Sequence, residues 1–202
     1  MDFGTWPHQL LVVDVEGNGA TPPDLVEVAA IPIADGRPVP ESARCTLVRP
    51  PQPITPFAAR IHRISNQAVE GAPSWEQVAP GVHTHLQHAW IAAHNASVDY
   101  TALRRHLPGW EPAGVIDTLR LARATYPAAP KYGLDALLAY TAIPLTGIDG
   151  QRHRAGFDAH ATALLLLNLA GHYPTWDALT AAAVPPGMPG FVSPRHEEPT
   201  LW

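Results

Sequence analysis

One apolar run, residues 9–16, constrains the fold of this chain more than any other feature. It reads QLLVVDVE and ends in two acids, Asp14 and Glu16, a pattern that favours a buried strand whose end emerges from the core. Side chains alternate across a strand, so residues 10, 12, 14 and 16 share one face while residues 11, 13 and 15 share the other. The two carboxylates therefore leave the strand side by side.

Two carboxylates that lie so close together repel each other, and each raises the pKa of the other unless a cation lies between them. Oxygen ligands of this kind suit Mg²⁺ or Mn²⁺. The alternative is a pair of exposed acids at a strand end, and Asp14 and Glu16 taken alone favour that simpler interpretation.

A third acid, Asp99, lies near the start of a helix predicted from about Ser97 to Leu107. Residues 99, 103, 106 and 107 fall along one stripe of that helix, and a carboxylate that heads an inward stripe is costly to bury without a partner. An acid favoured by the helix dipole, or a capping residue, is the alternative.

The segment HRAGFD carries a histidine, His153, and a fourth acid, Asp158. Five residues on an ideal helix place two side chains about 140° apart, so both cannot face one site from a regular helix. Gly156 offers a break, with His153 in a loop and Asp158 in the first turn of the leucine-rich helix. A loop histidine and a first-turn aspartate can then converge. Taken alone, His153 is a solvent-facing loop residue.

The order of elements predicts an α/β or α+β domain in which helices cover a mixed sheet. Strands are expected at 9–16, 25–34, 43–49, 90–93 and 115–116, and helices at 74–88, 97–107, 117–125, 133–141, 157–171 and 175–183. We expect a single domain over residues 1–183. Residues 184–202 contain five prolines and no periodicity, and are predicted to form a proline-rich tail.

Composition excludes several classes of protein. With 18 acids against 13 bases and a net charge of −5, the chain is not a basic module that holds nucleic acid by its overall charge. A single cysteine permits no internal disulfide. Neither a secretory signal nor an apolar run long enough to span a membrane is present, so we expect a cytoplasmic protein without membrane partners.

The chain resembles the DnaQ-like 3′→5′ exonucleases of the DEDDh group, and the resemblance covers about residues 9–170. It rests on an ordered set of motifs: LVVDVEGNG, EVAAIPI, PITPFAARIHRI, APSWEQV, IAAHNASVDYTALRRHL, VIDTLRLAR, YGLDALL and HRAGFDAHATALLLLNL. The resemblance implies a ribonuclease H-like mixed β-sheet flanked by α-helices. A tyrosine-bearing sister group has Tyr four residues before the last aspartate, where this chain has Arg154, so the histidine type is the better match.

By this resemblance, the four metal-binding acids are Asp14, Glu16, Asp99 and Asp158, and the catalytic histidine is His153. The four acids would hold two divalent cations, Mg²⁺ or Mn²⁺. The resemblance implies hydrolysis of the phosphodiester at the 3′ end of single-stranded DNA or RNA, with release of nucleoside 5′-monophosphates. His153 would act as the general base. The predicted substrate-binding residues are Gly17, Asn18, His94 and Asn95.

Counting two divalent cations changes the formal charge from −5 to −1, and Arg152 and Arg154 are expected to add local positive potential beside His153. The chain departs from the family at three positions. Gly17 stands where a threonine is usual, Val98 where a phenylalanine is usual, and Arg63 where a glycine is usual. These departures bear on substrate preference and rate rather than on metal chemistry.

Other functions remain as alternatives. The chain could be a non-catalytic exonuclease-fold module that binds nucleic acid or a polymerase partner, although none of the metal acids is lost. A haloacid-dehalogenase-like phosphatase would need a second aspartate where Glu16 stands. The histidines at 83, 85 and 88 are not expected to form a metal cluster, because His83 and His85 lie about 200° apart on a helix. A homodimer and a polymerase complex are both left open.

Overall fold

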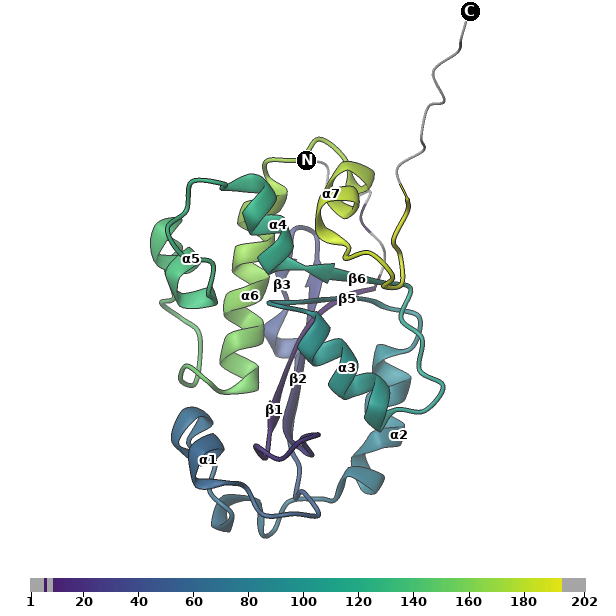
Figure 1. The fold of residues 1–202 in the computed structure, drawn as a ribbon, viewed down its shortest axis with the longest axis vertical. Coiled ribbons are helices and arrows are strands. Elements are labelled where there is room, and N and C mark those ends of the chain that lie inside the picture. Colours follow the sequence, from purple (N-terminus) through teal and green to yellow (C-terminus); the bar gives the residue numbers. More distant parts are fainter. Residues whose placement is uncertain (1–5, 7–8, 194–202) are drawn as a thin grey trace, which may run out of the picture.

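A computed structural model describes residue 6 and residues 9–193 of the chain (Figure 1). The strands are β1 (Leu10–Gly17), β2 (Leu25–Ala34), β3 (Arg37–Pro38), β4 (Arg44–Leu47), β5 (Trp90–Ala93) and β6 (Gly114–Asp117). The α-helices are α1 (Pro56–His62), α2 (Trp75–Leu86), α3 (Ser97–His106), α4 (Thr118–Thr125), α5 (Leu134–Tyr140), α6 (Ala155–Ala170) and α7 (Trp176–Ala183). Of two short 3₁₀ turns, η2 (Pro40–Ser42) lies between β3 and β4, and η3 (Gln67–Val69) lies between α1 and α2.

The strands form one mixed sheet in the order β3-β2-β1-β5-β6, with β4 also paired to β2. β1 runs antiparallel to β2 and parallel to β5, which in turn runs parallel to β6. The β1–β2 register places Asp14 opposite Ala29 and Glu16 opposite Glu27, and an irregularity follows between Glu16 and Gly17. The predicted mixed sheet flanked by helices, in a single domain, is confirmed.

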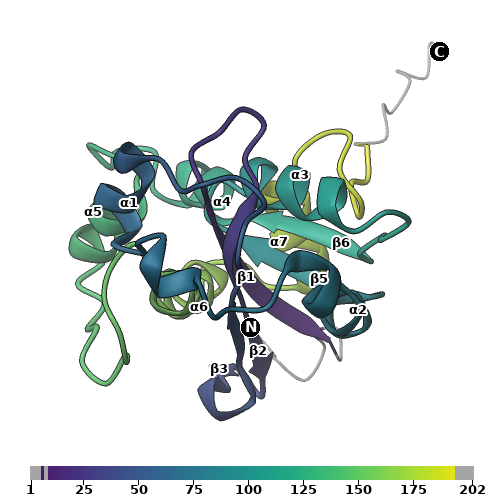
Figure 2. The same cartoon turned by 90° about the horizontal axis from the view of Figure 1, so that it is seen from below.

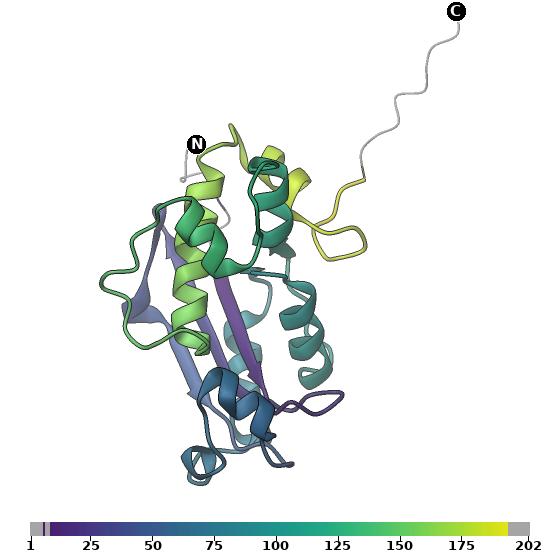
Figure 3. The ribbon, with the colours of Figure 1, turned by 60° about the vertical axis from the view of Figure 1, so that its left-hand side comes forward.

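Helices cover both faces of this sheet, and Figure 3 shows β1 between α6 and α3. On one face, Leu10 and Val12 pack with the leucines and alanines of α6. On the other, Leu11 and Val13 pack with Leu103 of α3. The predicted alternation of β1 is therefore confirmed, and it places the side chains of Asp14 and Glu16 on the face that α6 covers.

Local signals set where the helices begin and end. Ser74 forms the expected N-terminal cap of α2, in a reciprocal pair with Gln77. Thr55 caps α1, and that helix ends at Arg63, whose backbone is left-handed with a φ of 59°. A glycine is usual at such a helix end because it has no Cβ to clash. Figure 2 views the molecule from the end where α1 lies.

The described part of the predicted tail, residues 184–193, follows the outer edge of the sheet. The Val115 N–H of β6 donates a hydrogen bond to the Pro189 carbonyl at 3.0 Å. Val184 is buried, and a Cβ on Gly190 would lie 2.6 Å from the Trp90 ring. The boundary between residues 183 and 184 stays a prediction, and residues 194–202 lie outside the described part. No described helix has the length and apolar character needed to cross a membrane.

Candidate active site

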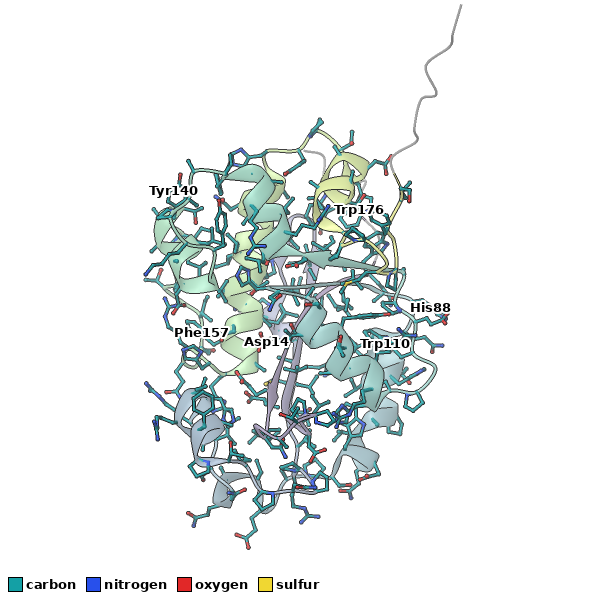
Figure 4. All side chains as sticks on the ribbon, viewed as in Figure 1. Asp14, His88, Trp110, Tyr140, Phe157 and Trp176 are labelled. Atoms are coloured by element: carbon teal, nitrogen blue, oxygen red, sulfur yellow. The ribbon has the colours of Figure 1, made fainter. Side chains whose placement is uncertain are left out.

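Asp14 and Glu16 stand at the C-terminal end of β1, where its apolar residues give way to acids. Both are partly buried, and both side chains lie on the α6 face of the sheet. Figure 4 shows Asp14 between α6 and the start of α3. The strand therefore presents two carboxylates on the face of the sheet that α6 covers.

Asp158 completes a group of three acids. It lies in the first turn of α6, which packs against β1 and β2. One carboxylate oxygen from each of Asp14, Glu16 and Asp158 lies within 4.8 Å of the other two. The structure thus brings together three of the four predicted metal acids, from β1 near the start of the chain and α6 near its end.

The fourth acid, Asp99, lies next to this group but is held differently. Its carboxylate accepts a hydrogen bond from the Val15 N–H at 3.1 Å, and the side chain is buried in the first turn of α3. The predicted stripe faces inward, since Leu103 and Leu107 are also buried. Asp99 therefore joins α3 to the strand position between Asp14 and Glu16.

The four carboxyl groups make the ionised state costly in the absence of a cation. Burial, and then the neighbouring acids Asp99, Glu16 and Asp158, raise the pKa of Asp14 well above its usual value. Burial and the nearby carboxylates raise the pKa of Glu16 to about 8. Burial raises the pKa of Asp99 to about 7 and also raises that of Asp158. Positive charge at this point would favour the ionised form of all four.

His153 lies in the loop that leads into α6. Its side chain is exposed, and its backbone N–H donates a hydrogen bond to Asp158 Oδ2 at 3.0 Å. The predicted placement of His153 in a loop and Asp158 in the first turn of the helix is observed, and convergence of the imidazole on the site stays a prediction. The predicted position of the break was wrong. The helix begins at Ala155 and includes Gly156, and the chain instead turns at His153, which has a φ of 61°.

The two arginines beside His153 are already paired. Arg154 binds the Glu27 carboxylate, and Arg152 forms an ion pair with Asp135 of α5. Both charges still act on the site: burial raises the pKa of Glu16 and of Asp158, and Arg154 opposes the rise at Glu16 while Arg152 opposes it at Asp158. The expected local positive potential is therefore present, although each arginine also pairs with a carboxylate. Gly156 has a packing role instead, since a Cβ there would lie 3.4 Å from Cys45 Sγ on β4.

Glu27 is a site residue that sequence reasoning missed. It is 2% exposed, and it lies directly opposite Glu16 in the β1–β2 register, so both side chains lie on the same face of the sheet. One signal was available: Glu27 is the single charged residue in the apolar run LVEVAAIPIA that forms β2. A charge inside such a strand needs a buried partner, and the partner comes from the loop before α6.

The predicted substrate-binding residues lie at this end of the sheet, at the end of β1 and in the loops after β1 and β5. In the loop after β1, the Asn18 side chain is buried; it accepts from the Asp24 and Ala20 N–H groups and donates to the Gln52 carbonyl. Gly17 packs against Pro23. A contact of either residue with substrate stays a prediction.

The loop after β5 holds His94 and Asn95. His94 is bound on both ring nitrogens, by the Thr118 hydroxyl and the Tyr132 carbonyl, and burial lowers its pKa. Asn95 has a φ of 67°, and its N–H donates to Asp117. These contacts fix the loop from which α3 and Asp99 begin. A contact of His94 or Asn95 with substrate also stays a prediction.

The donor set fits divalent cations that prefer oxygen. Three carboxylate oxygens from different residues lie within 4.8 Å of one another, and no sulfur or imidazole ligand accompanies them among the described residues. Asp14 and Glu16 are held by a strand and Asp158 by a helix, so regular secondary structure positions these three acids.

Comparisons with known proteins agree with this geometry. The model of the RNase T exonuclease family matches residues 11–166. Exodeoxyribonuclease 10 of Escherichia coli is 36% identical over 161 residues, which are 79% of this chain and 68% of that protein. The structure of exonuclease X in complex with 5′ overhanging duplex DNA has a TM-score of 0.71 and 34% identity, and the match covers 84% of this chain and 96% of the other.

A more distant structure shares the fold. The nuclease domain of 3′hExo, a DEDDh family member bound to rAMP, has a TM-score of 0.66 at 14% identity, with 83% of this chain and 94% of that domain covered. The family match spans β1 to α6 and so includes all four acids and His153. With three of those acids gathered around one point at the end of β1, the chain belongs to the RNase T family of DnaQ-like DEDDh nucleases, and it is a 3′→5′ exonuclease.

Proposed function

We propose that this protein removes nucleotides one at a time from the 3′ end of DNA, in a reaction that depends on two divalent cations, Mg²⁺ or Mn²⁺, and releases nucleoside 5′-monophosphates. The observation that carries the proposal is the meeting of Asp14, Glu16 and Asp158 within 4.8 Å, beside a loop histidine bound to Asp158 through its backbone. Asp99, buried next to them, is the fourth acid of the site.

Each side chain has a distinct task. Asp14, Glu16 and Asp158 would hold the cations, and Asp99 would support them from the α3 side. When bound, divalent cations supply activation of water and stabilisation of charge on the attacking and leaving oxygens. His153 would accept the proton of the attacking water, since its side chain is exposed and its backbone N–H holds it next to Asp158 in the chain fold. The water oxygen forms a bond to phosphorus, and the bond from phosphorus to the 3′ oxygen of the preceding nucleotide breaks.

Exposed apolar side chains beside the site support a single-stranded 3′ end as the substrate. On α1, Phe57 is 68% exposed and Ile61, one turn later, is 40% exposed. That helix packs on the loop after Glu16, because Thr55 donates its N–H to the Asn18 carbonyl. Bases stack on aromatic side chains irrespective of sequence. The choice of DNA follows the names of the relatives, an exodeoxyribonuclease and an exonuclease bound to DNA.

The test is digestion of an oligonucleotide labelled at its 5′ end, with Mn²⁺ or with EDTA, using DNA and RNA of one sequence. Wild-type protein should give a ladder that shortens from the 3′ end, only with metal and faster on DNA. Asp14→Asn and Asp158→Asn should abolish the ladder. Asp177→Asn, an exposed acid on α7, is the matched control and should retain full activity.

Two further outcomes separate the parts of the proposal. Faster digestion of RNA would reject the DNA assignment but keep the site. Binding without cleavage of single strands and overhanging duplexes, at any metal concentration, would show a non-catalytic module. His153→Ala should lower the rate while leaving Mn²⁺ affinity within about twofold, since a general base contributes to proton transfer rather than to metal binding.

A further inference from the structure

Glu27 is a buried acid to which the proposed chemistry gives no task. It lies on β2, 2% exposed, beside a site that already holds four carboxylates. Charged side chains are almost never so completely buried without a specific partner. Its position opposite Glu16 makes the burial more costly, because like charges directly across two strands repel.

Both carboxylate oxygens of Glu27 are occupied. Arg154 donates from Nε to Oε2 at 3.0 Å and from Nη2 to Oε1 at 2.5 Å, a bidentate pair. The Ala155 N–H donates to Oε2 at 2.8 Å. Because these hydrogen bonds come from Arg154 and from the first residue of α6, the oxygens of Glu27 are not free to serve as a fifth metal ligand.

These contacts act on the turn that carries the proposed general base. His153 directly precedes Arg154 and has a left-handed φ of 61°, a conformation that costs a non-glycine residue about 1 kcal/mol or more. The His153 N–H is bound to Asp158, and the Asp158 N–H is bound to the Arg154 carbonyl at 2.9 Å. Glu27 therefore ties the turn to the same sheet register that positions Glu16.

The pair can be reached from solvent on its far side. A cavity of about 620 Å³ between β2, β4 and α6 is lined by Glu27, Arg154, Cys45 and Gly156 and by none of the four metal acids. The Arg154 side chain is 32% exposed there. A substitution of Arg154 can thus change the His153 turn without placing a new side chain among the four metal acids.

We propose that Glu27 is a positioning residue for catalysis: by holding Arg154 and the first amide of α6, it fixes the His153 turn in the conformation in which the imidazole can accept a proton. This inference rests on the proposed role of His153. Glu27 touches neither substrate nor cation, so its effect should fall on the rate of the chemical step rather than on binding of the 3′ end.

The experiment compares Glu27→Gln and Arg154→Lys with wild type. Glutamine keeps the shape but loses the charge, and lysine keeps the charge but not the planar fork. We expect Glu27→Gln to lower kcat by about 10- to 100-fold with KM within about threefold, as is usual for residues that orient a reacting group. Arg154→Lys should lower kcat less. Exposed residues serve as matched controls, Glu111→Gln and Arg37→Lys, and should retain wild-type kcat.

Two readouts separate positioning from loss of stability. In EDTA, hydrogen exchange of the backbone amides at 153–158 should speed up in Glu27→Gln and Arg154→Lys, and not in the controls. In a His153→Ala background, Glu27→Gln should cost less than about twofold more in kcat, because residues that act as one unit are not additive. An equal fold-loss in both backgrounds would overturn the inference.

Further outcomes also decide the matter. Wild-type kcat in Glu27→Gln, with His153→Ala impaired, would refute the role of Glu27 while leaving the proposed function intact. Wild-type kcat in His153→Ala would instead refute the base on which the inference depends. If Glu27→Gln does not fold, Arg154→Lys carries the test alone, and unchanged kcat with unchanged exchange at 153–158 would refute the inference.

Discussion

Replacing Glu16 by glutamine should stabilise the metal-free protein, and increasingly so as pH rises. In the fold, burial and the nearby carboxylates raise the pKa of Glu16 from 4.5 to about 8. Below pH 4.5 the Glu16 carboxyl group is protonated in both the folded and the unfolded state, and the free energy of unfolding is unaffected by its ionisation. As pH rises from 4.5 to about 8, the unfolded chain ionises while the folded protein stays protonated, so the free energy of unfolding falls. Glutamine keeps the shape of the protonated acid and cannot ionise.

The size of the effect follows from the shift. One pKa unit corresponds to about 1.4 kcal/mol, so a rise from 4.5 to about 8 amounts to about 5 kcal/mol. Glu16 is partly exposed, and water screens part of its interaction with its neighbours, so we expect about half of this, 2 to 3 kcal/mol. The free energy of unfolding of Glu16→Gln should therefore exceed that of wild type by a margin that is small at pH 5 and reaches this value near pH 8.5.

Urea unfolding in EDTA, followed by tryptophan fluorescence at pH values from 5 to 9, measures that margin. Glu111→Gln, an exposed acid outside the site, is the control and should stay within about 0.5 kcal/mol of wild type at every pH. A margin for Glu16→Gln that stays constant, or shrinks, between pH 5 and pH 8.5 would refute the reasoning. With Mn²⁺ at 100 times its Kd, wild type should gain about 2.7 kcal/mol and the variant less.

Four further outcomes are expected. The affinity for Mn²⁺ should increase by up to about tenfold per pH unit from pH 6 to 8 in titration calorimetry, because Glu16 must lose its proton to bind metal; equal affinity across this range would contradict it. Phe57→Ala should raise KM for single-stranded DNA several-fold with kcat little changed, and an effect on kcat alone would remove the stacking role. Arg63→Gly should raise the free energy of unfolding in urea by up to about 1 kcal/mol, because glycine adopts the left-handed backbone freely. A free energy of unfolding below that of wild type would show that the lost hydrogen bond from Arg63 to Gln151 outweighs this gain. Gly19→Ala should lower the same quantity by about 2 kcal/mol or more, since its φ is 80° and a Cβ would lie 2.3 Å from Thr55 Oγ1; an unchanged value would mean that the loop after β1 can shift.

The parts of the site that depend on local pattern could be predicted from sequence. Alternation along β1 placed Asp14 and Glu16 on one face, and helical spacing turned Asp99 inward with Leu103, because each rests on the geometry of a single element. The joining of distant elements came from the ordered motifs of the family and not from periodicity. Neither the local pattern nor the family resemblance predicted the left-handed turn at His153. A non-glycine residue disfavours this backbone conformation, so contacts with other parts of the chain must impose it.

The contact that sequence reasoning missed, between Glu27 and Arg154, also changes how charge at the site should be counted. Five carboxylates lie around the end of β1, but Glu27 has its own cation in Arg154, and Arg152 is paired with Asp135. Four acids remain without a basic partner among the described residues, and burial raises the pKa of each. In the proposed function, two divalent cations neutralise the four negative charges of these acids. The net charge of −5 therefore reflects in large part a site that needs cations from solution, and it does not oppose a nucleic-acid substrate.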